Sequence, residues 1–125
     1  MKDGQVSFEL IIVIGILTLI LLFLISLSLT KKIEITKTEK ELNQRSECLK
    51  LASIILGVYI NGNGTIMYDK LSYNATLKPR SRLIEVNDEV SISCTIPIDA
   101  ISSRTLNKGA IKVTNIGDFI DVSNV

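Results

Sequence analysis

Apolar side chains are concentrated in one unbroken segment near the start of the chain. Residues 10–30 include no charged side chain, and nearly every position there is Leu, Ile, Val or Phe. As a helix with a rise of ~1.5 Å per residue, this segment would be about 32 Å long, which matches the apolar core of a bilayer. A soluble helix that is apolar on all sides would need a much larger protein to bury it. The pattern therefore predicts a membrane-spanning helix.

The next residues are polar, and no proline occurs before Pro79, so a helix could continue to about Gly57. β-branched residues between positions 33 and 38 weaken helix propensity, and we expect a bend near Thr36. Beyond the bend, apolar residues recur at helical spacing, which predicts a helix that packs on a following sheet. The residues of this expected face are Cys48, Leu49, Ala52, Ile55, Leu56 and Tyr59.

Beyond residue 57 the apolar period changes to that of β-strands. The sequence Asn61-Gly62-Asn63-Gly64 is a concentrated turn signal. Strand-like alternation follows over residues 71–77 and is clearest over 90–96, with further strands expected at 82–86, 110–114 and 119–122. The inward residues of the two alternating segments are Leu71, Tyr73, Ala75 and Leu77, then Val90, Ile92, Cys94 and Ile96. We expect an α+β fold: a long N-terminal hydrophobic helix followed by a small antiparallel β-sheet or sandwich.

Charge and composition narrow the functional classes. The chain has 14 basic and 13 acidic residues, a net charge of +1, no His and no Trp. A balanced charge argues against nucleic-acid binding, which usually needs a basic excess. The lack of His removes His-based metal sites and His-activated nucleophiles, so we expect no enzyme, no catalytic residue, no metal and no cofactor. Asp118 and Asp121 are interpreted as a solvated strand edge.

A short polar motif precedes the apolar segment. The segment is longer than the apolar part of a secretory signal peptide, and no small-residue cleavage site follows it, so we expect it to be retained. Gly4 is followed by Gln5-x-Ser7-x-Glu9 and then by the apolar run. This arrangement resembles the class III signal peptide of archaeal type IV pilin-like prepilins, a family with a Gln-x-Ser-x-Glu signature.

The resemblance implies how the chain is processed and organised. A prepilin peptidase would cut after Gly4 on the cytoplasmic side, removing a leader of residues 1–4 and leaving Gln5 as the mature N-terminus. Residues 5–30 would be the transmembrane and later filament-core helix, 31–57 an extension or linker packing on the sheet, and 58–125 the exported β domain. The chain would be a single-pass membrane precursor in contact with lipid, then a structural and adhesive subunit of an extracellular filament, with copies of itself or other pilins as partners.

Glu9 has a physical role to fill in such an assembly. An acid at the edge of an apolar segment is costly unless an opposite charge is close. After cleavage, the new amine of Gln5 and the carboxylate of Glu9 would share one helix face. We expect this charge pairing, within or between subunits, to set the stagger of subunits in a filament.

Cys48 and Cys94 both fall on expected inward faces. A disulfide between them would stabilise the domain by ~4 kcal/mol on the chain-entropy model and would indicate an oxidising exterior. The alternative is a pair of buried thiols. Asn63-Gly64-Thr65 and Asn74-Ala75-Thr76 match the N-glycosylation pattern, and surface glycans are common in the family that the signal peptide resembles.

A different topology also fits part of the sequence. Four lysines follow the apolar segment closely, and the positive-inside rule would then place the C-terminal part in the cytoplasm. These lysines are Lys31, Lys32, Lys37 and Lys40. The first alternative to a filament subunit is therefore a single-span anchored β domain that binds a partner and never polymerises. A second alternative, within the pilin class, is a minor pilin or pseudopilin.

Overall fold

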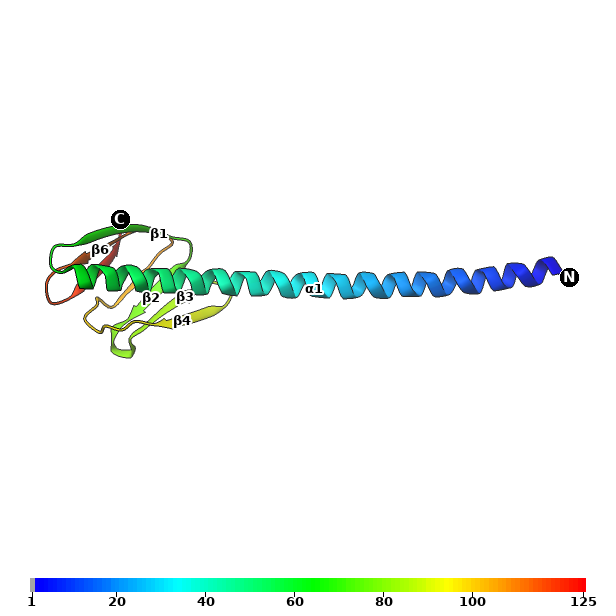
Figure 1. Cartoon of the computed structure of the whole chain (residues 1–125), viewed down its shortest axis with the longest axis horizontal. Helices are drawn as coiled ribbons and strands as arrows, with labels where there is room; N and C mark the ends of the chain where they lie inside the picture. Colours follow the sequence, from blue (N-terminus) through cyan, green and yellow to red (C-terminus); the bar gives the residue numbers. More distant parts are fainter. Residues whose placement is uncertain (1) are drawn as a thin grey trace. The chain divides into compact units, whose positions relative to one another are not determined.

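The chain begins with one long helix, α1 (Lys2–Asn61), in a computed structural model that describes residues 2–125 and the side chains from Ser7 onward. The chain separates into two compact units, Met1–Glu39 and Lys40–Val125, and each is described by itself. The first unit is helical throughout its described residues, and the second combines the end of α1 with seven strands (Figure 1). The expected α+β class, a long N-terminal helix followed by antiparallel sheets, is confirmed.

Helix α1 is not interrupted at Thr36, where the sequence predicted a bend. Four threonine hydroxyls along α1 each donate a hydrogen bond to the carbonyl four residues earlier, so their polar groups are satisfied within the helix. These bonds are Thr18 to Ile14 at 2.8 Å, Thr30 to Ser26 at 3.0 Å, Thr36 to Lys32 at 2.9 Å and Thr38 to Glu34 at 3.0 Å.

The end of α1 lies later than expected. The helix continues past Gly57 to Asn61, whose Nδ2 donates to the Gly57 carbonyl at 2.8 Å. Gly62 then takes a positive φ of 87°, which a glycine adopts without strain, and ends the helix. The turn signal at residues 61–64 therefore marked the helix end more accurately than Gly57 did.

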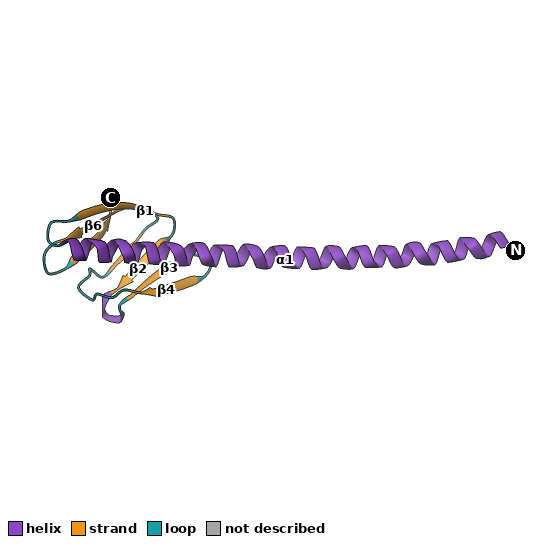
Figure 2. Ribbon diagram, in the orientation of Figure 1, coloured by secondary structure: helices purple, strands orange, loops and turns teal. Residues whose placement is uncertain are grey.

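Two antiparallel sheets follow the helix (Figure 2). The three-stranded sheet has the order β1-β6-β7, formed by β1 (Ile66–Leu71), β6 (Gly109–Asn115) and β7 (Ile120–Asn124). The four-stranded sheet has the order β4-β3-β2-β5, formed by β4 (Ser91–Thr95), β3 (Leu83–Asn87), β2 (Asn74–Lys78) and β5 (Arg104–Leu106). A 3-10 turn, η1 (Pro79–Ser81), joins β2 to β3.

The core of the second unit combines one face of α1 with apolar side chains from both sheets. On the helix the buried positions follow an alternating spacing of four and three residues, namely Gln44, Cys48, Leu51, Ile55 and Val58, with Ala52 beside them. Two residues of the expected face are wrong, because Leu49 is 54% exposed and Tyr59 is 47% exposed. Only a narrow stripe of the helix meets the sheets, so the wider face predicted from periodicity included positions at its edge.

The strand predictions were correct in type and less accurate in their limits. The alternating segment 71–77 is split, because Leu71 ends β1 and Asn74 begins β2 in the other sheet. Its alternation survives because Leu71, Ala75 and Leu77 all enter the same core. The segment 90–96 contains β4, and Ile96 is fully buried. The inward prediction for Val90 is wrong: Val90 is exposed, because it lies in the turn before β4 begins at Ser91.

The other expected strands correspond to β3, β6 and β7. β3 begins at Leu83 because Arg82 takes a left-handed φ of 53°. No periodic signal in the sequence marks β5, a strand of three residues. Such a strand is too short for an alternating pattern to be visible.

Candidate assembly segment and disulfide-linked head

The apolar segment of α1 is not buried by any part of the chain that the structure describes. Every side chain from position 7 to position 40 is exposed, and an 18-residue window of the helix has a mean hydropathy of 3.3 with none of it buried. A helix this long and apolar can cross a membrane by its length and composition. The hydroxyls of Thr18 and Thr30 donate hydrogen bonds to backbone carbonyls of the helix. Neither hydroxyl would therefore lack a hydrogen-bond acceptor in an apolar environment.

Gly15 interrupts the row of large apolar side chains in this segment. A methyl group at Gly15 would meet nothing within 4 Å, so no contact among the described residues requires the glycine. Small residues on apolar helices allow a second helix to approach closely. The absence of a side chain at Gly15 therefore leaves a notch on a surface that otherwise consists mostly of Leu, Ile, Val and Phe.

The motif residues lie at the start of α1. Ser7 and Glu9 are exposed on the helix, and no salt bridge to Glu9 occurs among the side chains that the structure describes. Gly4 and Gln5 belong to α1, but their side-chain positions lie outside the described part. Cleavage after Gly4 and pairing of Glu9 with the Gln5 amine therefore stay predictions.

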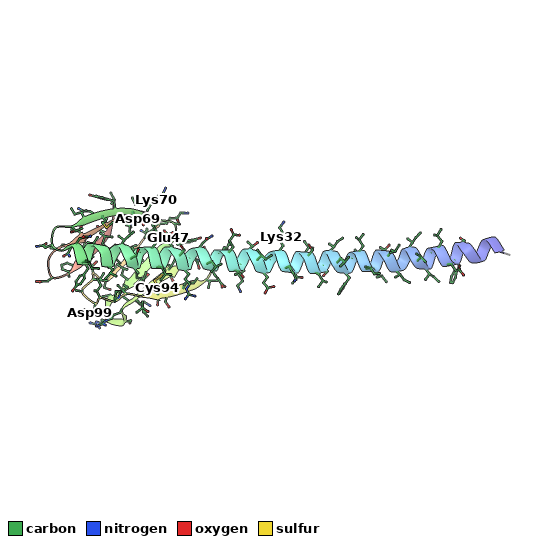
Figure 3. All side chains as sticks on the ribbon, in the orientation of Figure 1. Lys32, Glu47, Asp69, Lys70, Cys94 and Asp99 are labelled. Atoms are coloured by element: carbon green, nitrogen blue, oxygen red, sulfur yellow. A yellow bond between two sulfur atoms is a disulfide. The ribbon has the colours of Figure 1, made fainter. Side chains whose placement is uncertain are left out.

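Cys48 and Cys94 form a disulfide, with an S–S distance of 1.94 Å and Cα atoms 6.1 Å apart. The alternative of two buried thiols is therefore wrong. Cys48 is fully buried on α1. Cys94, which Figure 3 labels on β4, is half-buried. The bond joins the helix directly to the four-stranded sheet. Such bonds persist in oxidising environments and are rare in the cytosol.

Two ion pairs also hold α1 to strands or turns of the second unit. Lys50 Nζ lies 2.8 Å from both carboxylate oxygens of Asp69 on β1. Lys40 Nζ lies 2.8 Å from Glu89 Oε2 in the turn between β3 and β4. Beside the first pair, Glu47 Oε1 accepts a hydrogen bond from the backbone N–H of Ser72 at 2.9 Å.

The ion pairs shift the titration of their members. Partial burial opposes ionisation of Asp69, but hydrogen bonds from Lys50 and from the Lys70 backbone, with the charge of Lys50, outweigh it and lower the Asp69 pKa. The hydrogen bond to Asp69 raises the pKa of Lys50. The exposed pair behaves alike: hydrogen bonding raises the pKa of Lys40 and lowers that of Glu89. We call the second unit, Lys40–Val125, the head. Folding of the head therefore favours the charged forms of these four side chains.

Asn115 is a structural residue that sequence reasoning missed. Its side chain is 4% exposed, its Nδ2 donates to the Val58 carbonyl at 3.1 Å, and its Oδ1 accepts from the Gly117 N–H at 2.9 Å. One side chain thus satisfies a carbonyl in the last turn of α1 and fixes the turn between β6 and β7. The turn signal at positions 115–117 was visible in the sequence, but its contact with the helix was not.

Gln44 is a second buried polar residue that the sequence did not single out. It is 2% exposed, and its Oε1 has no hydrogen-bond partner among the described residues. It lies four residues before Cys48, at the start of the buried stripe on α1. A spacing of four from an expected core cysteine was the signal that could have found it.

The two glycosylation sequons lie on the surface of the head. Asn63 is exposed in the turn after α1, with its side chain beside Gly117. Asn74 is exposed at the start of β2, and its Oδ1 accepts a hydrogen bond from the Lys108 N–H at 2.8 Å. Both asparagines can be reached from solvent, although the Asn74 amide already has a structural role.

The two acidic residues near the C-terminus, Asp118 and Asp121, lie apart from one another in role: one is in an ion pair and the other is exposed in a turn. Asp121 Oδ1 lies 3.9 Å from Arg104 Nη2, and Asp118 is exposed in the turn between β6 and β7. Within residues 2–125, no group of three or more His, Cys, Asp or Glu side chains is placed to hold a metal ion.

Comparison with protein-family models, with curated proteins and with solved structures found no match to this chain. The class that the structure defines is an α+β protein with an exposed apolar helical segment and a disulfide-linked β head. The apolar helix is compatible with anchoring in a membrane.

Proposed function

We propose that the chain is a structural subunit of an archaeal type IV pilus-like surface filament. One observation supports the proposal above all others. The motif Gly4-Gln5-x-Ser7-x-Glu9 is followed directly by an apolar helical segment with a mean hydropathy of 3.3, and the structure buries none of this segment. The precursor is held in the membrane by this segment, and a prepilin peptidase cuts after Gly4. The head is then carried outward as the apolar helices of neighbouring subunits associate, and the finished filament adheres to surfaces.

The exposed apolar surface supplies the reason to assemble. Outside a bilayer this surface would contact water at a large free-energy cost, so it needs either lipid or other helices around it. In the precursor, lipid surrounds it; in the filament, the same segments of other copies replace the lipid. The notch at Gly15 gives neighbouring helices a place for close approach.

Glu9 supplies the register in this proposal. Apolar packing alone allows helices to slide along one another, because many staggers bury similar areas. A carboxylate inside the bundle makes most of these staggers unfavourable, since it must meet an opposite charge. The amine of a mature Gln5 is the partner in the proposal.

The disulfide supports an exported head. Cys48 and Cys94 would be kept reduced in most cytosols, and their bond fits a head outside the cell. The lysines after the apolar segment favour the second candidate, a single-span anchored β domain that binds a partner and does not polymerise. Lys31 and Lys32 are exposed on α1, and the two candidates differ in whether filaments contain the chain.

The test is to shear surface material from cells that make this protein and to label it with antibody against the head for electron microscopy. The filament proposal predicts antibody label along the sheared filaments. Material sheared from cells that lack the chain should carry no label. Label confined to membrane fragments, with unlabelled filaments, would contradict the proposal and favour the anchored domain.

A further inference from the structure

A basic turn lies at one end of the four-stranded sheet. The sequence Lys78-Pro79-Arg80-Ser81-Arg82 joins β2 to β3 through η1 and carries three cations in five residues. Two hollows flank the turn, and Pro79 and Arg80 line both of them. One is about 420 Å³ and is completed by Lys78, Ser81 and Ser103; the other is about 490 Å³ and is completed by Arg82, Asp99 and Ile101.

The three cations are not equivalent. Lys78 Nζ lies 2.6 Å from Glu85 Oε1, and Arg82 Nη2 lies 3.2 Å from Asp99 Oδ2, so each has an acidic neighbour. Arg80 is exposed and makes no salt bridge to any side chain in the described part of the chain. The positive charge that both hollows share is therefore available to a ligand.

The backbone holds Arg80 in a defined place. Pro79 fixes its own φ at the start of η1, and the Arg82 N–H donates to the Pro79 carbonyl at 3.0 Å. The Arg82 carbonyl accepts from the Ile96 N–H at 2.8 Å, which ties the turn to the residue after β4. A turn that is bonded in this way loses little conformational entropy when a ligand binds.

We propose that the two hollows bind an acidic polysaccharide, with a carboxylate or sulfate group on the Arg80 guanidinium. Arginine recognises such planar or multi-oxygen anions through two hydrogen bonds at once. Ser81 and Ser103 supply hydroxyls for sugar hydroxyls, and the half-buried ring of Pro79 supplies an apolar surface for a sugar face. Two adjoining hollows with one shared cation suit an extended chain of repeating units.

Two adjoining hollows suit a polysaccharide, an extended chain of repeating units, better than a single lipid headgroup. The proposal rests on the exported head of the proposed function, but it does not depend on polymerisation.

The experiment uses the full chain in a neutral detergent and measures its binding to immobilised dextran sulfate, with uncharged dextran as the reference surface. Arg80→Gln is compared with Arg45→Gln, because both remove one exposed positive charge from the second unit and neither residue makes a salt bridge among the described side chains. We expect Arg80→Gln to raise Kd about tenfold, as for the loss of a charge-assisted hydrogen bond, and Arg45→Gln to leave Kd unchanged.

Three results would overturn the proposal. These are equal binding to uncharged dextran, equal weakening by the two substitutions, and Arg80-dependent binding to polyglutamate that matches the binding to dextran sulfate. The last would assign the hollows to an acidic polypeptide instead. Arg80→Gln should leave filaments intact. If the wild-type protein forms filaments but does not bind dextran sulfate, only this inference is overturned. Arg80-dependent binding without filaments overturns only the filament proposal.

Discussion

Cys48 on α1 and Cys94 on β4 are 46 positions apart in sequence and are joined by a disulfide. Cys48 also lies against β3, with its Sγ 3.5 Å from the Ile84 carbonyl oxygen. At this point the helix is therefore covalently bonded to β4 and in contact with the neighbouring strand β3 of the four-stranded sheet. In a head with so few residues, a covalent link of this kind adds to what a small core can supply.

Removing the disulfide should destabilise the head strongly. The double substitution Cys48→Ala and Cys94→Ala frees a long loop in the unfolded chain, and we expect the free energy of unfolding to fall by ~4 kcal/mol. Urea unfolding of the full chain in detergent measures this change. Leu49→Ala, at the exposed neighbour of Cys48, should change stability by less than about 0.5 kcal/mol. An unchanged unfolding midpoint in the double variant would contradict a stabilising role for the bond.

Asp69 should make the stability of the head depend on acid. Because folding lowers its pKa, its contribution is present above the unfolded value of about 3.9 and is lost as the pH falls through the lower folded value. Asp69→Asn should therefore cost at most about 1 kcal/mol at pH 7, since Lys50 is half exposed, and progressively less as the pH falls through the lowered folded value.

Urea unfolding at pH 7, 4 and 2 checks this prediction. Asp118→Asn is the matched control, because Asp118 is exposed and makes no salt bridge among the described side chains. The control should show no such loss at any of the three values. A difference between Asp69→Asn and wild type that stays constant from pH 7 to pH 2 would exclude the ion pair as its cause.

Asn115→Leu should destabilise the head by about 1–3 kcal/mol. The substitution keeps a side chain of similar size but leaves the Val58 carbonyl and the Gly117 N–H without their partner. Hydrogen exchange should speed up in the last turn of α1 and in the turn between β6 and β7. Asn43→Leu, at an exposed position of α1 whose side chain makes no hydrogen bond among the described residues, serves as the control. Equal protection in the two variants would show that the Asn115 bonds contribute little.

Glu9→Ala should separate assembly from insertion. The apolar segment is unchanged, so we expect normal membrane insertion and normal processing, with filaments lost or wrongly staggered because the register charge is missing. Glu34→Ala removes an exposed acid of α1 outside the apolar segment and should leave filaments normal. Electron microscopy of sheared material compares the two. Filaments of wild-type appearance from Glu9→Ala would eliminate the charge-register mechanism.

The parts of the fold that a local pattern determines could be predicted from the sequence. The apolar segment and the strands β3, β4, β6 and β7 leave a periodic signal. The helix end was expected at Gly57 instead of Asn61, although the turn signal at residues 61–64 marks it. The positions of Cys48 and Cys94 were also predictable, since both lie on apolar faces. Their pairing was one of two alternatives until the structure showed the bond.

Contacts between distant segments could not be predicted in this way. Asn115 bonds to Val58 across 57 positions, and Lys50 pairs with Asp69 on a strand whose first residues are exposed. Neither contact leaves a periodic trace, because each depends on how two elements meet. The shared position of Arg80 beside two hollows is of the same kind, since Ser103 and Asp99 reach it from a later part of the chain.

The most direct test of the filament account is the mass of the N-terminal peptide, measured on protein from native membranes and from sheared surface material. The account predicts a chain that begins at Gln5 in the sheared fraction, because cleavage after Gly4 must precede assembly and creates the amine that pairs with Glu9. A chain that keeps Met1 or Lys2 and occurs only in membranes would contradict the account and favour a singly anchored β domain.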